Sequence, residues 1–504
     1  MKDQLIILPL LIHLLFSIVL MFFWRVVKVQ KTLTIIGNSL ALIASVWVFI
    51  HVYEHGTQTF QAGSWEAPFG ITFVGDMLAA TLVLLTAISG FAVSIFSVVS
   101  VIKARLRFGF FSVLHFLLMG LNGAFLTGDI FNLYVWFEVI IISSFVLISL
   151  GGEKYQLEGG VKYFTLNFLA SMIFLTGLGV LYGLAGTLNM ADLSVQIAAI
   201  ENRALVDVTA VLFLVGFGIK SAVFPLYFWL PASYHTPPSA VSAIFAGLLT
   251  KVGVYALMRV FTLVFIEDVF LETLLLSLAI LSIFSGGIGA LIQNNVRKVF
   301  SYLIICHIGF MIGGLGLFTE VALAGVAFYL IHDIIVKTNV FLVGGLMYRL
   351  RSTTNLKKLG GLYEEYPKIS LLMLIPLLSL VGIPPFSGFW PKLSLILAGF
   401  QEANYWYVGA VIFGSIVTLL CVARIWSEAF WKKPLEVKKW KKFVEFDQLR
   451  TLQKQQIIFP ILFLSIVSLY IGFGAEHIQQ VAERIAAELM DPSAYIDVVL
   501  KEKS

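Results

Sequence analysis

Long apolar stretches, separated by short polar connections, run along almost the whole chain. An apolar stretch of about 18 residues or more is long enough for an α-helix to cross a bilayer. No alternating pattern typical of strands competes with these stretches, and backbone groups without partners cannot face lipid. The pattern therefore predicts an all-α polytopic membrane protein with about fourteen transmembrane helices. Their approximate positions are 4–23, 32–52, 73–101, 109–127, 129–150, 162–185, 206–230, 238–261, 269–292, 299–318, 321–348, 369–400, 405–430 and 457–476.

The spans predict one membrane domain over residues 1–504 rather than separate soluble domains. Residues 1–108 hold the first three spans, and residues 109–261 hold a first set of five. Residues 269–430 hold a second set of five, and residues 431–504 hold a basic connection, the last span and a tail.

Connections rich in lysine and arginine alternate with connections that have few or none. The connection after span 1 holds Arg25, Lys28 and Lys31, whereas the connection after span 2, HVYEHGTQTFQAGSWEAPFG, holds none. The alternation continues along the chain, and the connection after span 13 is the most basic. Cytoplasmic connections of membrane proteins carry the excess of positive charge. We therefore expect a protein of the cell membrane with its odd-to-even connections in the cytoplasm and both termini outside.

Two connections have the composition of helices that lie on a membrane surface. Residues 190–205 are amphipathic on the predicted outer side, and residues 437–456 are basic with regularly spaced aromatic side chains on the inner side. An interfacial helix explains both segments. Docking against a neighbouring subunit is the alternative.

Composition supports the membrane assignment and excludes several functions. The chain is 59% hydrophobic and 12% charged, whereas a soluble domain carries about 25% charged residues. Its two cysteines, Cys306 and Cys421, both lie in apolar runs and form no metal or disulfide framework. We find no Ser/His/Asp arrangement and no phosphate-binding glycine loop. The sequence therefore predicts lipid surroundings and no catalytic residue, metal, cofactor or nucleic-acid partner.

Four lysines lie inside the apolar spans: Lys220, Lys251, Lys337 and Lys392. A charge at the centre of a bilayer costs about 2.5–3.5 kcal/mol on insertion scales. Lys220 lies about ten residues, or roughly 15 Å, from the inner end of its span. A lysine stem of about 6 Å cannot cover that distance by snorkelling. The side chain must therefore face protein or internal water.

Acidic and histidine side chains accompany these lysines. Glu138 is the one carboxylate near the centre of the first five spans, and it needs a cation or a proton, with Lys220 as the obvious partner. Asp333 precedes Lys337 by four residues, so both share one helical face. Either a private salt bridge or a relay explains that pair. His307 and His332 are either satisfied core residues or members of the same polar set.

Buried lysines with carboxylates nearby are suited to moving protons. Burial favours the neutral amine, and a nearby carboxylate favours the ammonium form, so a change in the carboxylate switches the lysine between holding and releasing a proton. A row of such groups with water between them forms a proton relay.

Two of the spans are interrupted by proline. GIKSAVFPLYFWLP at 218–231 contains Pro225 and Pro231, and SLVGIPPFSGFWPKLSL at 379–395 contains Pro384 and Pro385. The lysine precedes the interruption in the first span and follows it in the second. We interpret this mirrored order, in corresponding halves, as a sign of two inverted five-helix repeats, spans 4–8 and 9–13, with broken helices 7 and 12.

The stretch GFGIKSAVFPLYFWLPASYHTPPSAVSAIFAGLLTKVGVYALMR at 216–259 resembles the core signature of the antiporter-like membrane subunits. These subunits occur in respiratory complex I, in membrane-bound hydrogenases and in Mrp multisubunit cation/proton antiporters. The resemblance covers nearly the whole chain, and GIPPFSGFWPK is similar to the span-12 motif of the D-type Mrp subunits.

This resemblance implies roles for individual residues. Glu138 and Lys220 would form the pair between spans 5 and 7, Lys251 would continue the relay in span 8, and Lys392 would be its terminal lysine. His332 and Lys337 match the polar cluster of span 11, whereas the match of His307 is less secure.

The resemblance also implies a function and partners. The expected protein is the proton-translocating subunit of a multisubunit cation/proton antiporter that exchanges Na⁺ for H⁺. It would be a secondary transporter rather than an enzyme, and it would work with other membrane subunits in a hetero-oligomer. The alternative is a proton-pumping subunit of respiratory complex I or of a membrane-bound hydrogenase, which has the same relay and a different driving force.

Overall fold

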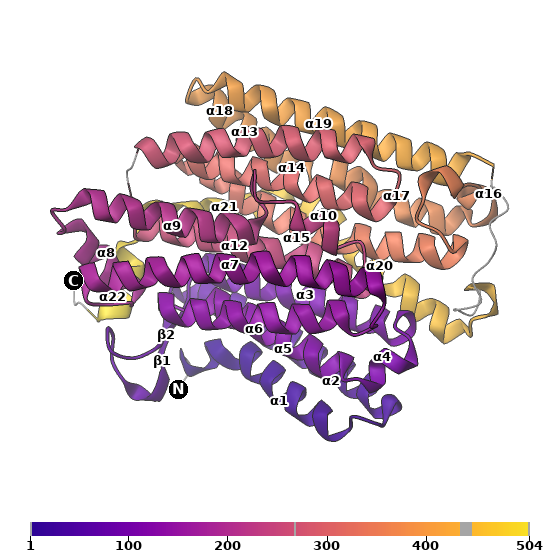
Figure 1. The fold of residues 1–504 in the computed structure, drawn as a ribbon, viewed down its shortest axis with the longest axis horizontal. Helices are drawn as coiled ribbons and strands as arrows, with labels where there is room; N and C mark the ends of the chain where they lie inside the picture. Colours follow the sequence, from indigo (N-terminus) through magenta and orange to yellow (C-terminus); the bar gives the residue numbers. More distant parts are fainter. Residues whose placement is uncertain (1–2, 267–268, 434–445, 502–504) are drawn as a thin grey trace.

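The computed structural model describes residues 3–266, 269–433 and 446–501. Long helices that lie side by side along one common direction dominate it, which confirms the predicted fold class (Figure 1). Within these residues twelve helices are long and apolar enough to cross a membrane. Two shorter apolar helices, Phe110–Leu126 and Pro367–Val381, lie on predicted spans 4 and 12. Fourteen crossings therefore remain a prediction, because length and composition alone identify twelve.

The N-terminal section combines helices with a small hairpin that the sequence pattern missed. Its elements are η1 (Asp3–Ile7), α1 (Leu8–Phe22), α2 (Val27–His55), β1 (Gln58–Gln61), η2 (Ala62–Ser64), β2 (Thr72–Gly75), α3 (Met77–Ser100) and α4 (Lys103–Arg107). The strands pair antiparallel, with Gln58 opposite Gly75. Predicted span 3 therefore starts too early, at residue 73. Asp76 ends the strand segment and caps α3, because its side chain accepts a hydrogen bond from the Ala79 N–H.

The two middle sections contain the interrupted helices. The first comprises α5 (Phe110–Leu126), α6 (Ile130–Ser149), α7 (Lys154–Ala185), α8 (Met190–Ala198), α9 (Arg203–Ser221), α10 (Trp229–Ser233), α11 (Ser239–Ile244), the π turn η3 (Phe245–Leu249) and α12 (Thr250–Leu263). The second comprises α13 (Val269–Ile292), α14 (Val296–Leu317), α15 (Glu320–Arg351), η4 (Leu356–Lys358), α16 (Leu362–Glu365), α17 (Pro367–Val381), α18 (Phe389–Gln401), α19 (Tyr405–Trp426) and the π turn η5 (Ser427–Trp431).

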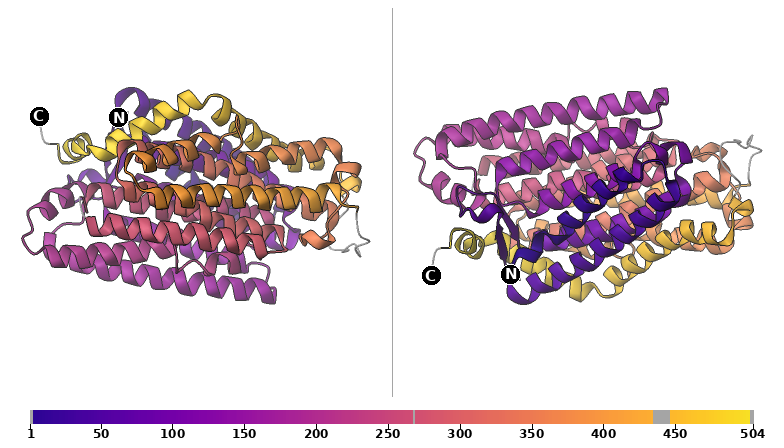
Figure 2. Two further views of the ribbon diagram at one scale, coloured as in Figure 1. Left: turned by 90° about the horizontal axis from the view of Figure 1, so that it is seen from above. Right: turned by 90° about the horizontal axis from the view of Figure 1, so that it is seen from below.

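The C-terminal section folds back onto the bundle rather than ending as a simple tail. It comprises η6 (Phe446–Gln448), α20 (Thr451–Phe473), α21 (Ala475–Met490) and α22 (Ser493–Leu500). α21 packs on α15 and α3, and α22 packs on α8. Both termini consequently lie at the same end of the bundle (Figures 1 and 2).

The two predicted surface helices have different outcomes. Residues 190–198 form α8, whose Leu193 and Ile197 are buried. This helix packs on α7, α12 and α22 of the same chain through one face, whereas Val195 and Gln196 on its other face are exposed. Most of the second segment, residues 437–445, lies outside the described residues, and residues 451–456 belong to α20.

The interrupted helices share one local construction. α9 ends at Ala222 with φ 61°, and α17 ends at Gly382 with φ 79°, both in the left-handed region. Glycine adopts this conformation without steric cost, whereas alanine does so with strain. Pro225 and Pro385 stand at the third position after these caps. Neither helix can continue through its proline, and a short second helix follows in each case.

The connections at the two ends of the bundle are also matched. Asp129 forms an isolated antiparallel bridge with Asn189, and Asn295 forms the same bridge with Asn355 at equal spacing. All four side chains accept hydrogen bonds at the start of the helix or turn that follows. α8, which follows the first bridge, and α16, which follows the second, lie at opposite ends of the bundle in Figure 1.

The mirrored order of lysine and break was interpreted wrongly as a sign of a repeat. Lys220 lies in the last turn of α9 and Lys392 in the first turn of α18. A two-fold axis in the membrane plane preserves the direction of the chain, so equivalent residues keep the same order along it. The order of lysine and break therefore does not indicate a repeat. The matched caps and bridges are the features on which an inference of inverted repeats can rest.

A buried ion pair holds the end of the bundle at which the termini lie. Arg259 on α12 pairs with Asp76 at 2.5 Å, and both side chains are about 95% buried. The rings of Tyr255 and Tyr495 flank the guanidinium. Glu488 of α21 accepts a hydrogen bond from the Met77 N–H beside this pair. The C-terminal helices therefore close over a charge pair that joins α3 to α12.

We expect Asp76→Asn to destabilise the folded protein, because it keeps the cap on α3 and leaves Arg259 as an unpaired buried charge. Breaking a buried pair by removing one partner costs about 3–5 kcal/mol. Thermal unfolding of the purified protein measures the effect. Lys501→Gln is the control, because it breaks the exposed Lys501–Glu66 pair and should leave the unfolding temperature unchanged. Equal unfolding temperatures for both variants would contradict the prediction.

Candidate functional site

Lys220 is buried at the first break, where α9 ends. Its side chain is 4% exposed, and its ammonium donates a hydrogen bond to Ser171 Oγ on α7 at 3.0 Å. The ammonium also lies 4.5 Å from the ring centre of Phe137 on α6. Cation–π contact and one hydroxyl therefore replace the water that this ammonium would have outside the protein.

Glu138 and Lys220, the predicted partners, interact electrostatically but are not in direct contact. Among the described residues, no carboxylate lies within 4.0 Å of the Lys220 ammonium. Glu138 follows Phe137 on α6 and interacts with Lys220 over a longer distance, and its buried Oε1 has no hydrogen-bond partner. A cavity of about 20 Å³ lies beside Lys220, Tyr163 and Asn167. That volume admits about one water molecule beside the Lys220 ammonium, but Glu138 does not line the cavity.

The backbone N–H and C=O groups freed at the first break form hydrogen bonds with side chains of the protein. Ile219 C=O accepts a hydrogen bond from the Trp229 indole N–H at 2.9 Å. Phe224 N–H donates to Ser282 Oγ at 2.9 Å. The prolines Pro225 and Pro231 thus bend the span, and nearby donors and acceptors satisfy the backbone groups that the bend exposes.

Lys251 sits just beyond a π turn in its span and is fully buried. Its ammonium donates to Ala246 C=O at 2.8 Å, a carbonyl within the π turn. The same ammonium lies 2.7 Å from Asp333 Oδ2 on α15. π turns within α-helices occur frequently at functional sites because they free backbone groups. The turn here supplies a second oxygen to a buried ammonium.

Asp333 is the centre of a buried charged cluster. Besides Lys251, its carboxylate lies 3.4 Å from His307 Nδ1 and 3.9 Å from Lys337 Nζ. Lys337 donates to Leu303 C=O at 3.1 Å, and His307 Nε2 lies 3.1 Å from Thr418 Oγ1. Asp333 is therefore not paired with Lys337 alone, because the ammonium of Lys251 on another helix lies closer to its carboxylate.

Asp333 and His307 are site residues that sequence reasoning left out of the relay. The spacing of four residues pointed from Asp333 to Lys337, which share a helix. The nearest cation, Lys251, comes from a helix more than eighty residues earlier in the chain. Local periodicity carries no information about that packing.

Lys392 lies at the second break, where it binds the backbone. Its ammonium donates to Val381 C=O at 2.6 Å and lies 3.5 Å from Leu380 C=O. These carbonyls end α17, and the proline-containing break leaves them without helical N–H partners. The side chain is 5% exposed and approaches the Phe310 ring. Lys392 therefore reaches back across the break that precedes it, with Pro384 and Pro385 in between.

His332 begins a chain of buried hydroxyl groups at the second break. His332 Nδ1 lies 2.8 Å from Ser387 Oγ, which lies 3.0 Å from Ser468 Oγ. Ser468 donates to Ser379 Oγ at 2.9 Å. Ser379 lies on α17 and Ser387 lies within the break, and all four residues are fully buried. No sequence pattern pointed to this chain of hydroxyls, because serine is common in membrane helices.

The ionisable groups come from six helices of the bundle, α6, α9, α12, α14, α15 and α18. α9 and α12 approach closely at Gly253, where a Cβ atom would collide with Ser221. Within the described part of the chain, no direct hydrogen bond joins Lys220 to Lys251 or the Asp333 cluster to Lys392. The fold therefore forms separate buried sites in neighbouring helices, called stations below: Lys220 with Glu138, the Asp333 cluster, and Lys392 with His332. Proton transfer between these stations would require water or side-chain movement.

A polytopic helical bundle with ionisable groups from several helices inside it belongs to the class of ion-transporting membrane proteins. The model of the NADH:quinone oxidoreductase/Mrp antiporter transmembrane family matches residues 127–418. The chain belongs to this family.

Relatives with the same length are the D-type subunits of Na(+)/H(+) antiporters. The chain is 41% identical to the D-type subunit of Alkalihalophilus pseudofirmus, over 99% of this chain and 100% of that protein. It is 40% identical to the D-type subunit of Bacillus subtilis over the same shares.

Two solved structures have the same fold. The Mrp complex from Dietzia sp. DQ12-45-1b contains a chain that is 27% identical with a TM-score of 0.90, and the match covers 99% of both chains. A chain of the membrane-bound sulfane sulfur reductase, an archaeal respiratory membrane complex, is 27% identical with a TM-score of 0.87. That match covers 99% of this chain and 100% of the other.

We expect Asp333→Asn to abolish most ion transport while the protein still accumulates in the membrane. The change removes the one carboxylate shared by Lys251, Lys337 and His307. It should lower the transport rate about tenfold or more, because no carboxylate would then favour the protonated form of either lysine in turn. Cation-dependent proton movement in membrane vesicles, normalised to protein amount, measures the rate.

Glu364→Gln is the matched control for this change, because Glu364 is an exposed carboxylate on α16. It should transport at the unmodified rate. Equal rates for Asp333→Asn and the control would show that the cluster is structural only.

Proposed function

We propose that this chain is the proton-translocating subunit of a multisubunit Na⁺/H⁺ antiporter. It works as a secondary transporter together with other membrane subunits, with Na⁺ and H⁺ as the transported ions. The observation that carries the proposal is the Asp333 cluster, in which one fully buried carboxylate serves two lysines and a histidine. The names of its D-type relatives, and the complex that contains a structural match, support the same function.

The cluster holds a proton that can change position. One carboxylate balances one ammonium, so Lys251 and Lys337 are not both neutralised by Asp333. Burial favours the neutral form of the second amine. Asp333 lies 2.7 Å from Lys251 and 3.9 Å from Lys337. A small movement of the carboxylate toward Lys337 would favour its protonation and release the proton on Lys251.

The remaining stations extend the path to either side of the cluster. Glu138 and Lys220 lie on the side of the first break, and a small cavity lies beside Lys220 and Tyr163. His332 and Lys392 lie at the second break, where serine hydroxyls form a continuous hydrogen-bonded chain. Hydroxyl groups both donate and accept, so such a chain can pass a proton by reorientation. In this proposal protons move between the stations along the plane of the membrane.

We also infer that the two middle sections are inverted repeats. The left-handed caps at Ala222 and Gly382, and the paired bridges at opposite ends of the bundle, support this arrangement. A repeat relation would explain why each section contains one broken helix with a buried lysine beside it.

The proposed orientation places both termini outside the cell membrane. The end of the bundle opposite the termini carries the basic connections, including Arg105 on α4, and the cytoplasmic side carries the excess of positive charge. The hairpin, α8 and the C-terminal helices would then lie on the outer surface.

A proton-pumping subunit of a redox complex is the second candidate. The structural match to a respiratory membrane complex favours it, because the same fold operates there. Affinity purification of the intact complex distinguishes the two. A purified complex that contains membrane subunits alone would support the antiporter. Flavin and iron–sulfur proteins in the purified complex would support the redox complex.

We expect Glu138→Ala and Lys220→Ala to abolish Na⁺-dependent proton movement in vesicles from an antiporter-deficient host. Both changes remove a charge that the proposed path uses. Glu158→Ala and Lys162→Ala are matched controls, because these residues form an exposed pair in the same section. The controls should transport normally. Normal rates in the two test variants, with the complex assembled, would rule out the proposed path.

We expect Ser64→Cys to react with a membrane-impermeant maleimide on intact cells and Lys357→Cys to react only after the membrane is opened. Ser64 lies beside the hairpin, and Lys357 lies in η4 at the opposite end. The native cysteines Cys306 and Cys421 are buried and should give little background. The reverse labelling pattern would invert the orientation.

A further inference from the structure

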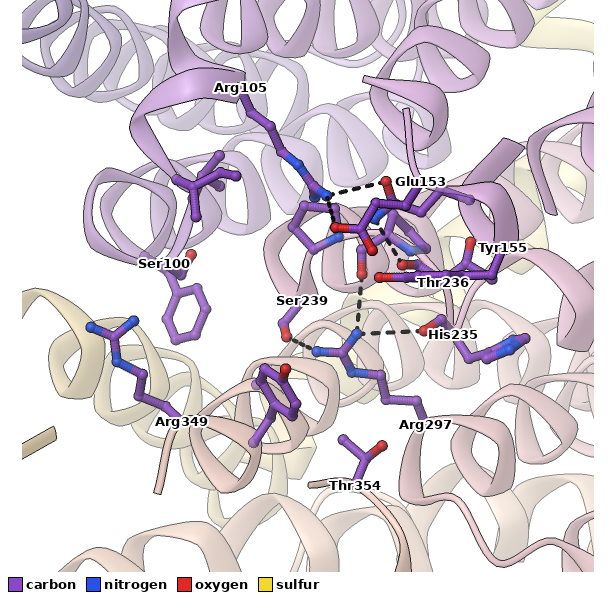
Figure 3. A pocket seen from close by; sticks show the side chains of 18 of the residues that line it. Ser100, Arg105, Glu153, Tyr155, His235, Thr236, Ser239, Arg297, Arg349 and Thr354 are labelled. Carbon is purple, nitrogen blue, oxygen red and sulfur yellow. Dashed lines mark hydrogen bonds and ion pairs between the residues drawn. The ribbon is translucent and has the colours of Figure 1, made fainter. Parts of the chain in front are cut away.

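A second polar site lies away from the buried relay, at the end of the bundle opposite the termini. It is a cavity of about 250 Å³ between α3, α4, α7, α14, α15 and the connection from α10 to α11. Its lining includes three arginines, Arg105, Arg297 and Arg349, and one carboxylate, Glu153. Figure 3 shows Arg105 and Arg297 approaching from opposite sides. Among the described residues that line the cavity, arginines outnumber carboxylates.

Arg105 and Arg297 are both 9% exposed, so their guanidinium groups are largely removed from bulk water. Arg105 donates to Gln156 Oε1 at 3.1 Å and lies 3.9 Å from Glu153. Arg297 donates to Pro237 C=O at 3.0 Å and to Ser239 Oγ, and its Nε has no hydrogen-bond partner. Among the described residues no carboxylate lies within 4.0 Å of Arg297.

Arg297 is thus a buried cation that only neutral acceptors surround. Removing a charge from water costs several kcal/mol unless an opposite charge compensates it. His235, which also lines the cavity, does not change this balance at neutral pH. Burial, helped by the charge of Lys298, lowers the pKa of His235 to about 4, so its ring stays neutral. An anion in the cavity would compensate the remaining charge.

We propose that this cavity binds the phosphate group of an anionic membrane lipid. Guanidinium groups bind phosphate oxygens in a bidentate manner and more strongly than neutral donors do. Ser239 lines the same space, and its hydroxyl accepts from Arg297, so its own proton can be donated to a further phosphate oxygen. The proposal does not depend on the ion path, because none of the relay residues lines the cavity.

The surroundings favour a lipid over free phosphate. Phe96, Val101, Ile102 and Ile457 give the cavity an apolar side. A groove of about 520 Å³ on α3 and α20 is lined by four apolar side chains, Ile95, Ile458, Phe459 and Leu462, and by four polar or charged ones, Thr451, Lys454, Gln455 and Gln456. Neighbouring residues of the same two helices line the two spaces: Ile95 and Ile458 line the groove, and Phe96 and Ile457 line the cavity. Basic pockets between membrane helices on the cytoplasmic side bind anionic headgroups, and the four apolar side chains of the groove can contact an acyl chain.

A lipid at this place would act on the broken helix. Arg297 holds the connection at 237–239, which leads from α10 through α11 to the π turn before Lys251. A phosphate that stabilises Arg297 would stabilise this connection as well. The lipid would therefore join α4 and α14 to the segment that positions Lys251.

Lipid titration of the assembled, delipidated complex tests the proposal. Native mass spectrometry measures binding of phosphatidylglycerol against phosphatidylcholine. We expect a preference of about tenfold for phosphatidylglycerol, as for added charged hydrogen bonds. Arg105→Gln and Ser239→Asp should each remove it. Ser239→Asp places a carboxylate beside Arg297 at the start of α11, where it mimics the bound anion and favours folding.

Arg351→Gln is the matched control, because Arg351 lies at the same end and pairs with Glu365 outside the cavity. It should keep the preference. Wild-type protein without a preference, or an unchanged preference in Arg105→Gln and Ser239→Asp, would overturn the proposal. Inorganic phosphate alone is titrated in parallel against thermal unfolding. Stabilisation equal to that by phosphatidylglycerol would identify a free anion as the occupant instead of a lipid.

Discussion

The ion pair between Lys251 and Asp333 is the constraint on which the interior of this protein depends. Both side chains are fully buried and come from different helices, so α12 and α15 must pack with these two residues facing each other. Neither charge is tolerable there alone, because a low-dielectric interior penalises an unpaired ion far more than water does. Lys337 and His307 share the same carboxylate. The cluster thus contains more basic groups than its one carboxylate can neutralise.

The two breaks solve one problem in different ways. Each ends a helix with a left-handed residue and a proline, and each has a lysine nearby. At the first break, an indole N–H and a serine hydroxyl form hydrogen bonds with the exposed backbone groups. Lys220 contacts Ser171 and Phe137 instead. At the second break Lys392 itself takes the free carbonyls. Lys220 therefore does not bind the backbone groups of the first break, whereas Lys392 binds the free carbonyls of the second break.

The ends of the bundle differ in charge balance. At the end with the termini, Arg259 is neutralised by Asp76 and covered by the C-terminal helices. At the other end, Arg297 has only neutral partners and lines an open cavity. One end of the bundle therefore neutralises its buried arginine with a carboxylate, whereas the buried Arg297 at the other end has neutral hydrogen-bond partners within the described residues.

The sequence by itself determined the membrane fold class, the approximate positions of the twelve long apolar helices, the interruptions at Pro225 and Pro385 and the set of buried lysines. Each of these follows from local composition, because a long apolar run, a proline or a charge within it has the same consequence wherever the helix packs. Only the tertiary structure decided which groups meet. It brought Asp333 to Lys251 instead of to Lys337 alone, separated Glu138 from direct contact with Lys220, and aligned serines from α17, α20 and the second break with His332. Those outcomes depend on how helices far apart in the chain are rotated and offset against each other, and periodicity within one helix does not encode that geometry.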